Sequence, residues 1–260
     1  MKRILYLSKQ FVKLFLRCIF CYIAGGQTCI ICGKKTFLYP VCTECRHTRF
    51  TDSLTRCSSL YENRCQICGK PLLSTKKTCF ACRENQLLKS TDSMLPLYSY
   101  RLWNKELMFL WKTQEIRVIS NMFAKFLNPV LKRMEAQFIV PVPPRKGKIN
   151  QKGWDQIDEL CSLLQYRYGY KILRILERRT KIQQKKLDRE GRLQQIGHAY
   201  CCISASARTK LLKPYGGRLP QTVVLLDDVC TTGATIESCA RVLKEVGIKH
   251  VNALSLFIVD

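Results

Sequence analysis

Two adjacent acids followed by a hydroxyl-rich loop are the residues of this chain best suited to chemistry. Asp227 and Asp228 follow the aliphatic run 223–226, which is typical of a buried parallel strand. Ligands of open α/β sheets bind at the carboxyl edge of such strands, so we expect both carboxylates at that edge. The chain then enters a predicted helix from about 235 to 246, whose first N–H groups and dipole favour an anion. The order of these features predicts a phosphate in the loop and ribose hydroxyls on the two acids.

The loop itself contributes small residues, backbone donors and hydroxyl groups. A solvated acidic turn followed by a helix cap would contain the same residue types. The order of strand, acids, loop and helix favours a phosphate site instead. The expected phosphate-binding residues are Val229, Cys230, Thr231, Thr232, Gly233, Ala234 and Thr235.

The run DDVCTTGAT at 227–235 is similar to the phosphoribosyl pyrophosphate (PRPP) motif of type I phosphoribosyltransferases. In that family the two acids hold the ribose 2′ and 3′ hydroxyls, and the TTGAT loop wraps the 5′-phosphate. The resemblance implies an α/β fold with a type I phosphoribosyltransferase-like parallel sheet flanked by helices. If the chain is a catalyst, the resemblance also implies Mg²⁺ bound with PRPP, with Asp227 and Asp228 as the catalytic residues.

A second buried strand is expected at 137–144, where it ends in a proline-defined loop. Backbone N–H groups and cations at the end of a sheet strand suit a pyrophosphate. We therefore assign Pro143, Arg145 and Lys146 as candidates for the pyrophosphate loop, although an ordinary strand-to-helix connection would also contain surface lysines. The other expected elements are a strand at 95–100, helices at 104–112, 119–134 and 151–168, and a strand at 170–176.

Eight of the 16 cysteines form four Cys-x-x-Cys pairs between residues 29 and 82. Each such turn presents two thiolates, and two turns can close a tetrahedral Zn–S site. We expect two structural zinc ions in a small N-terminal double zinc-ribbon module. Disulfides or an iron–sulfur cluster are the alternatives, and sequential pairing of the turns is simpler than cross-braced pairing. The expected ligands are Cys29, Cys32, Cys42, Cys45, Cys65, Cys68, Cys79 and Cys82.

The chain is strongly basic. Lys and Arg outnumber Asp and Glu by 44 to 19, which gives a formal net charge of +25. The excess lies before residue 221, because residues 221–260 carry 3 basic and 5 acidic side chains. A field of this sign attracts polyanions, so we expect nucleic acid, above all single-stranded DNA, as the first partner and an anionic membrane surface as the second. A basic composition without functional meaning would give the same excess.

Residues 1–26 mix apolar residues with five cations and contain no uncharged run long enough to span a membrane. We expect a basic amphipathic segment that contacts a membrane or a partner. A signal peptide fits poorly, because charges interrupt the apolar stretch and metal-type cysteines follow it. Three regions are expected: this segment, a cysteine-rich zinc-binding module at 27–90 and a phosphoribosyltransferase-like domain at 91–260. The expected location is the cytoplasm, either free or peripheral to the inner face of the membrane.

Several motifs together resemble the ComF/GntX family over nearly the whole chain. They are the paired cysteine knuckles, the strand with VPVP at 140–143, the run KGWDQ at 152–156, a Gln-x-x-Leu-x-Arg segment at 184–189 and DDVCTTGAT. The family-matched positions are Lys152, Gly153, Gln156, Gln184, Arg189 and Arg192. The chain departs from the family at Asp155, where members commonly have Asn, and this places a carboxylate in the expected site.

The resemblance implies a role in natural competence, because the family includes late competence proteins needed for the uptake and internalisation of single-stranded transforming DNA. It leaves open a PRPP-dependent phosphoribosyltransferase of nucleotide or base salvage, so the sequence does not decide whether the chain is an enzyme. A third interpretation is a zinc-dependent adaptor that recruits a helicase or a membrane DNA-channel protein through residues 1–23. His198 and Trp154 are candidates for base contacts, but a lone His or Trp is more often a packing or surface residue.

Overall fold

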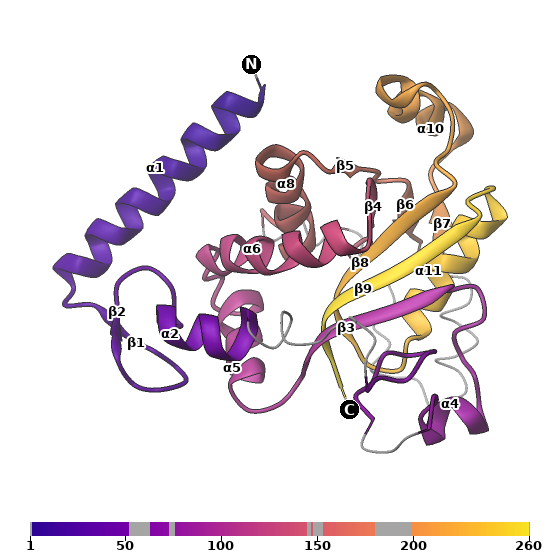
Figure 1. The fold of residues 1–260 in the computed structure, drawn as a ribbon. Coiled ribbons are helices and arrows are strands. Elements are labelled where there is room, and N and C mark those ends of the chain that lie inside the picture. The colour runs from indigo at the N-terminus through magenta and orange to yellow at the C-terminus, as the bar shows by residue number, and fades with distance from the viewer. Residues whose placement is uncertain are drawn as a thin grey trace.

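The computed structural model describes residues 2–51, 63–72, 76–144, 147, 153–179 and 199–259 (Figure 1). The helices in chain order are α1 (Lys2–Ile23), α2 (Thr43–Arg46), α4 (Phe80–Glu84), α5 (Trp103–Lys112), α6 (Val118–Arg133), α8 (Gln156–Tyr168), α10 (Ala205–Leu212) and α11 (Ala234–Glu245). A π-helical turn occupies His47–Thr51 and a 3-10 turn occupies Lys213–Tyr215. The strands are β1 (Gln27–Thr28), β2 (Lys35–Thr36), β3 (Ser93–Ser99), β4 (Phe138–Pro141), β5 (Lys171–Ile172), β6 (Leu176–Arg178), β7 (Tyr200–Cys202), β8 (Thr222–Cys230) and β9 (His250–Ile258).

Five strands form one parallel sheet in the order β3-β9-β8-β4-β5. β8 is the central strand, and its residue Val224 pairs with Asn252 of β9 and with Ile139 of β4. Residues 223–226 are buried, as expected for a parallel strand covered on both faces. The expected class, an α/β fold with a parallel sheet flanked by helices, is confirmed.

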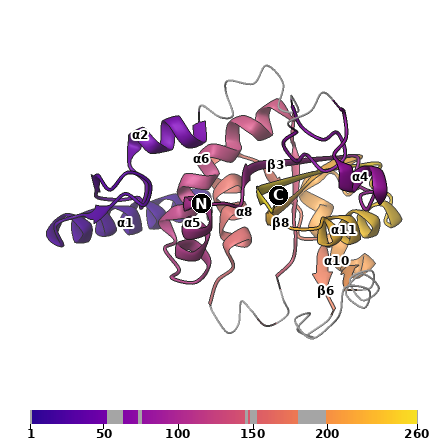
Figure 2. The same ribbon diagram turned by 90° about the horizontal axis from the view of Figure 1, so that it is seen from below.

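Helices cover both faces of this sheet (Figure 2). Leu226 and Leu254 point to the face that α5, α6 and α8 cover, whereas Leu225 and Val251 point to the face that α11 covers. α8 follows β4 and α11 follows β8, so two adjacent strands send their helices to opposite faces. The carboxyl edge between β4 and β8 is therefore a topological switch point, where α/β proteins bind their ligands.

The largest differences from the predicted element boundaries occur in β4, in the strand predicted at 170–176 and in α8. β4 ends at Pro141, because Pro143 and Pro144 have no N–H to donate to a ladder. The strand predicted at 170–176 is divided between β5, which belongs to the main sheet, and β6, which pairs with β7 outside it. α8 begins at Gln156, directly after its N-cap.

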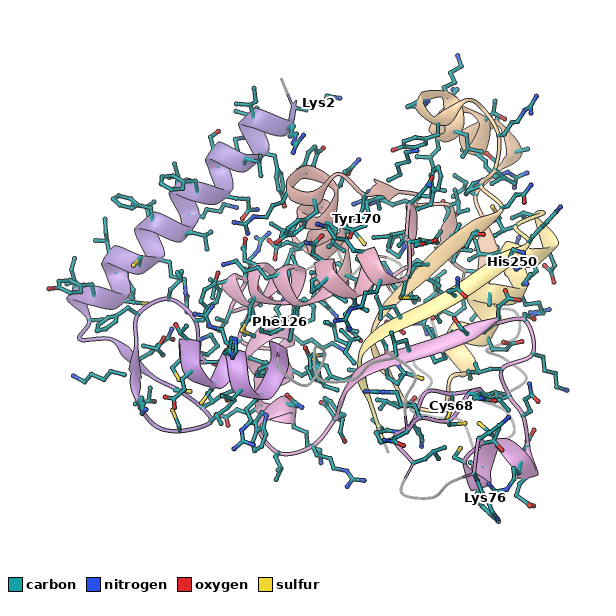
Figure 3. All side chains as sticks on the ribbon, in the orientation of Figure 1. Lys2, Cys68, Lys76, Phe126, Tyr170 and His250 are labelled. Carbon is teal, nitrogen blue, oxygen red and sulfur yellow. The ribbon has the colours of Figure 1, made fainter. Side chains whose placement is uncertain are left out.

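The two cysteine-rich segments pack on different faces of the sheet. The first belongs to the core beneath α5 and α6, where the ring of Phe50 stacks on Phe126 with 5.1 Å between centroids. The second packs on the α11 face, where Arg64 donates a 2.6 Å hydrogen bond to the carbonyl oxygen of Pro96. Figure 3 labels Phe126 and Cys68, one from each location. The region boundaries at 26 and 90 stay a prediction.

α1 lies against α8 at the side of the molecule (Figure 1). The rings of Tyr6 and Tyr166 stack with 4.5 Å between centroids, and Nε of Arg3 donates to the carbonyl oxygen of Tyr166 at 2.9 Å. Among the described residues, no helix is long and apolar enough to cross a membrane.

Candidate functional site

Asp228 is the buried member of the acid pair at the end of β8, with 8% of its surface exposed. Its Oδ2 accepts a hydrogen bond from Nε2 of Gln156 at 2.7 Å and lies 2.8 Å from Nζ of Lys112. These partners come from α8 and α5, which cover the same face of the sheet. A neutral donor and a cation together compensate the burial of the carboxylate.

Asp227 lies beside it and is partly exposed. Its Oδ1 accepts a hydrogen bond from the backbone N–H of Asp228 at 2.8 Å. Exclusion of water by the surrounding protein raises the pKa of Asp227 to about 7, and the charge of Asp228 adds to the increase. Lys112 lowers this pKa but does not offset the other two effects. The pair thus combines one anchored carboxylate with one that gains or loses its proton near neutral pH.

β4 brings the start of the predicted pyrophosphate loop to the same edge. Pro141 pairs with Leu226, and the N–H of Val142 donates to the carbonyl oxygen of Leu226 at 2.9 Å. Pro143 follows at once and is partly exposed. The other two loop candidates, Arg145 and Lys146, lie outside the described residues.

The loop after β8 leads directly into α11. Thr231 and Thr232 are exposed, and Oγ1 of Thr232 accepts a hydrogen bond from the N–H of Ala234 at 3.3 Å. Gly233 precedes α11 with φ of 87°, in the left-handed region that favours glycine. The hydroxyl of Thr235 interacts with that of Tyr200 on β7. Hydroxyl and N–H groups at a helix N-terminus suit the phosphate end of a ribose phosphate.

Two of the predicted phosphate-binding residues belong to the strand rather than to the loop. Val229 is partly exposed and Cys230 is buried as the last residue of β8. Burial raises the pKa of the Cys230 thiol to about 12, and the charges of Asp227 and Cys68 add to this effect. The thiol is therefore protonated and apolar in character at neutral pH.

Glu237 ties the first turn of α11 to the segment that precedes β3. Its Oε1 accepts the N–H of Ser90 at 2.6 Å, and its Oε2 accepts both the N–H of Thr91 at 3.2 Å and the hydroxyl of Thr91 at 3.0 Å. In the same segment, Cδ2 of Leu88 lies 3.1 Å from the position that a Cβ would take at Gly233. The segment 88–91 therefore packs against Gly233 and the first turn of α11.

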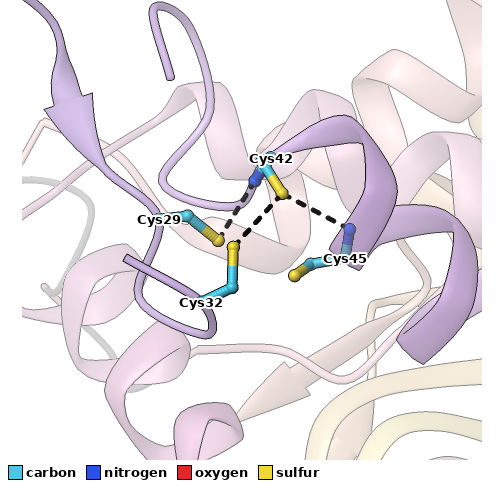
Figure 4. Close-up of side chains that lie close together, drawn as sticks. All are labelled: Cys29, Cys32, Cys42 and Cys45. Atoms are coloured by element: carbon cyan, nitrogen blue, oxygen red, sulfur yellow. Dashed lines mark hydrogen bonds between the residues drawn. The ribbon is translucent and has the colours of Figure 1, made fainter. Parts of the chain in front are cut away.

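The first four-cysteine cluster has the geometry of a metal site (Figure 4). The Sγ atoms of Cys29, Cys32, Cys42 and Cys45 all lie within 4.8 Å of one another. Sγ of Cys32 lies 3.7 Å from Sγ of Cys42. That separation matches the edge of about 3.8 Å in a tetrahedron with Zn–S bonds of about 2.3 Å. Burial raises the pKa of Cys29, but N–H donation from Cys42 and neighbouring residues outweighs it and lowers the pKa to about 7. The donor set fits a structural zinc ion.

The second cluster repeats this geometry. Its four Sγ atoms lie within 4.8 Å of one another, and those of Cys68 and Cys79 are 3.6 Å apart. The N–H of Cys79 donates to Sγ of Cys65 at 3.3 Å, as Cys42 does to Cys29 in the first cluster. Each cluster joins consecutive knuckles, which is the sequential pairing, and every cysteine in the described part of the chain is free of disulfides.

Three known proteins are similar to this chain over most of its length. No protein-family model matches the chain. Competence protein ComFC of Streptococcus pneumoniae is 25% identical over 237 residues, which cover 88% of this chain and 98% of that protein. Competence protein ComFC of Bacillus subtilis is 26% identical over 217 residues, or 80% of this chain and 79% of that protein. Competence protein F of Haemophilus influenzae is 25% identical over 255 residues, which cover 92% of this chain and 96% of that protein. The matches support assigning the chain to the ComF family.

Asp155 is the position at which this chain departs from the commonest ComF residue. This residue is 5% exposed and is the N-cap of α8, because its Oδ1 accepts the N–H groups of Ile157 at 3.0 Å and Asp158 at 3.1 Å. Asn and Asp serve equally well at this position. The departure from the commonest ComF residue therefore keeps the cap.

Two of the positions that match the ComF family, Gly153 and Gln156, lie among the described residues. Gln156 reaches Asp228, and Gly153 has φ of 71° in the turn that leads to α8. Trp154 is 7% exposed with the guanidinium of Arg117 at 5.2 Å from its ring centroid, so it is a packing residue. The predicted residues Lys152, Gln184, Arg189, Arg192 and His198 lie outside the described part of the chain.

Sequence reasoning missed two residues of the site. Lys112 is more than a hundred positions from Asp228, and no local pattern connects the two. Glu237 carried a weak signal, because an acid in the first turn of a helix is favoured by the helix dipole. Its role in holding residues 90 and 91 follows only from the fold.

Proposed function

We propose that this ComF-family chain acts in natural competence, in the uptake and internalisation of single-stranded transforming DNA, and that it carries a PRPP-type ribose-phosphate site. The observation that carries the proposal is the position of Asp227 and Asp228 at the switch point between β8 and β4, next to the N-terminus of α11. The names of the three relatives, all competence proteins, support the biological role.

The described residues suggest how a ribose phosphate would bind. Asp227, partly exposed, would accept hydrogen bonds from the sugar hydroxyls, while Asp228 is held in place by Gln156 and Lys112. The hydroxyls and N–H groups of residues 231–235 would hold the 5′-phosphate. Asp227 and Asp228 would hold the sugar directly or through Mg²⁺, which would neutralise charge on the pyrophosphate of PRPP.

We assign DNA binding to the basic surface rather than to the acid pair. Internal nucleotides of DNA have no free 2′ or 3′ hydroxyl for two carboxylates to hold, and adjacent acids repel a phosphate backbone. The chain as a whole carries +25, which attracts polyanions. We therefore expect affinity for single-stranded DNA that falls steeply as salt is added.

We place the protein in the cytoplasm at the inner face of the membrane. The DNA strand enters there, and a helicase or a DNA-channel protein would be the partner that delivers or receives it. The charge and the amphipathic segment at 2–23 support this location.

Titration of the purified full chain with PRPP plus Mg²⁺, and separately with short single-stranded DNA, tests the proposal. Asp227→Asn/Asp228→Asn should weaken PRPP binding by about tenfold or more, because charge-assisted hydrogen bonds are lost. The same variant should leave DNA affinity unchanged or slightly higher. The control Glu135→Gln/Glu245→Gln removes two acids that are exposed at the opposite edge of the sheet and should leave both affinities unchanged.

If the wild type binds neither ligand at low salt, the proposal fails. If PRPP and DNA compete for one site and the double variant loses both, DNA binds at the acid pair and not at the basic surface. A phosphoribosyltransferase of nucleotide or base salvage is the second candidate, because the same acid pair and loop suit displacement of pyrophosphate. Release of pyrophosphate from PRPP on addition of a nucleobase would establish it.

A further inference from the structure

α1 presents its apolar side chains to the outside of the molecule. Figure 3 shows side chains of α1 extending away from the rest of the protein. Their exposed fractions run from 41% at Ile19 to 78% at Ile23. At about 100° of rotation per residue, most of these side chains lie in one outward arc. The exposed large apolar residues of α1 are Ile4, Leu5, Phe11, Val12, Phe15, Leu16, Ile19, Phe20, Tyr22 and Ile23.

The inward face of α1 is mixed, because Tyr6 and Leu14 pack against the protein's apolar core beside polar contacts of Arg3 and Arg17. Nε of Arg17 donates to the carbonyl oxygen of Leu38 at 3.2 Å, as Arg3 does to Tyr166. A hollow of about 190 Å³ lies between this face and the body of the protein, lined by Gln10, Lys13, Leu14, Arg17, Glu115, Arg117, Val118, Asn121 and Glu159. A helix that served only to cover the protein's own core would have the opposite orientation.

The charges of α1 indicate what covers its apolar face. Lys2, Lys9 and Lys13 are exposed, and the helix contains no acid. A second copy of the chain would place lysines against lysines, and each copy carries +25, so like charges oppose pairing of two such faces. An anionic lipid surface suits both the apolar face and the lysines of α1. Apolar side chains enter the boundary between headgroups and acyl chains, while lysines contact the headgroups.

We propose that α1 lies in the plane of an anionic bilayer, with its apolar face in the headgroup boundary and Lys2 and Lys9 on the phosphates. The helix is not apolar enough to span the bilayer. Contacts of Tyr6, Arg3 and Arg17 with the body then hold the sheet domain at the lipid surface. This inference rests on the membrane location within the proposed function and is independent of the ribose-phosphate site.

Vesicle flotation of the full chain tests the inference. Vesicles of phosphatidylcholine alone, or of phosphatidylcholine with phosphatidylglycerol, are mixed with protein in the absence of PRPP and DNA. We expect binding only to the vesicles that contain phosphatidylglycerol. Phe11→Ser/Phe15→Ser should weaken it by about tenfold or more, because two buried rings are lost. Lys2→Glu/Lys9→Glu should weaken it by a similar factor. All four side chains are exposed, so circular dichroism and zinc content should match the wild type.

The charge-matched control is Lys105→Glu/Lys210→Glu, which changes the net charge equally at exposed positions outside α1. It should retain binding within about twofold, since distant exposed charges are screened. Absence of binding to the anionic vesicles, or equal loss in the control, would overturn the inference. A concentration-dependent dimer that Phe11→Ser/Phe15→Ser dissociates would assign the face to a second copy instead. Because no PRPP or DNA is present, a negative result leaves the proposed ribose-phosphate and DNA binding untouched.

Discussion

Gln156 at the start of α8 donates a 2.7 Å hydrogen bond to Asp228 at the end of β8. The two residues are 7% and 8% exposed, so water does not replace either partner. α8 follows β4, and the bond therefore joins the two strands on either side of the switch point. Gln156 fixes the buried acid without adding a charge to the site, which leaves Lys112 as its cation.

Replacing Gln156 by Ala should lower the free energy of unfolding by about 1–3 kcal/mol, because a buried acceptor loses a donor that water cannot supply. PRPP affinity should fall as well. Gln165 lies on the same helix and is partly exposed, so Gln165→Ala is the matched control and should change stability by less than about 0.5 kcal/mol. Urea denaturation measures both variants. Equal destabilisation by the two substitutions would show that the hydrogen bond from Gln156 to Asp228 does not contribute measurably to stability.

Asp227 should make stability depend on pH. Burial and the charge of Asp228 raise its pKa in the folded protein to about 7 from 3.8. Between these values the unfolded chain releases a proton that the folded chain keeps, so stability from this group is complete below about pH 3.8 and is lost as pH rises through about 7. Asp227→Asn cannot ionise. Its stability relative to the wild type should rise by on the order of 2 kcal/mol between about pH 5 and pH 8, measured as unfolding free energy.

Asp92 should change stability with pH in the direction opposite to Asp227. Burial would raise the pKa of Asp92, but Lys244 and the N–H of Val251 outweigh burial and lower it. Its charged form therefore stabilises the fold above the unfolded pKa, and that stability is lost as pH falls. Asp92→Asn should be less stable than the wild type at pH 8. If the unfolding free energies of both variants, relative to the wild type, changed with pH in the same direction, the raised pKa of Asp227 would be contradicted.

Gly233 should be the least replaceable residue of the loop. An alanine there would adopt a left-handed φ of 87° and place its Cβ 3.1 Å from Leu88, so both strain and displacement of the 88–91 segment follow. Gly216 has a φ of 82° with no atom near its Cβ position, so Gly216→Ala isolates the strain of about 1 kcal/mol. We expect Gly233→Ala to lose more stability than Gly216→Ala and to weaken PRPP binding, which Gly216→Ala should not do. Equal PRPP affinities in calorimetric titration would argue against the phosphate loop.

The second cysteine cluster should matter more to the proposed ribose-phosphate site than the first. Cys82 is followed closely by the segment whose residues 88, 90 and 91 support Gly233 and Glu237. Cys65→Ser/Cys79→Ser and Cys29→Ser/Cys42→Ser should each reduce bound zinc by about one ion per chain. Only Cys65→Ser/Cys79→Ser, in the second cluster, should also weaken PRPP binding by about tenfold or more, measured at a temperature where both variants are folded. Equal loss of PRPP affinity in both would contradict separate roles.

The sequence predicted those parts of the molecule that local patterns determine. Residues 223–226 were recognisable as a buried parallel strand, and the spacing of the knuckles predicted both four-cysteine clusters. The separation of the clusters onto two faces depends on contacts such as Phe50 with Phe126 and Arg64 with Pro96, which are far apart in the chain. The Lys112 and Gln156 contacts of Asp228 are of the same kind.

The outward orientation of α1 shows another limit of sequence reading. A periodic apolar pattern predicts an amphipathic helix over residues 2–23, but it does not say which face meets the protein. Only the contacts of Arg3, Tyr6 and Arg17 with the body establish that the apolar face is turned outward.

Hydrogen exchange with and without PRPP and Mg²⁺ tests the ribose-phosphate site most directly. We expect slower amide exchange in peptides that cover 227–235 and in those that cover 141–144, with no change in peptides from α1 or the first cysteine cluster. Asp227→Asn/Asp228→Asn should abolish this protection. Unchanged exchange over 227–235 at saturating PRPP, or protection confined to other segments, would contradict a ribose-phosphate site at the end of β8.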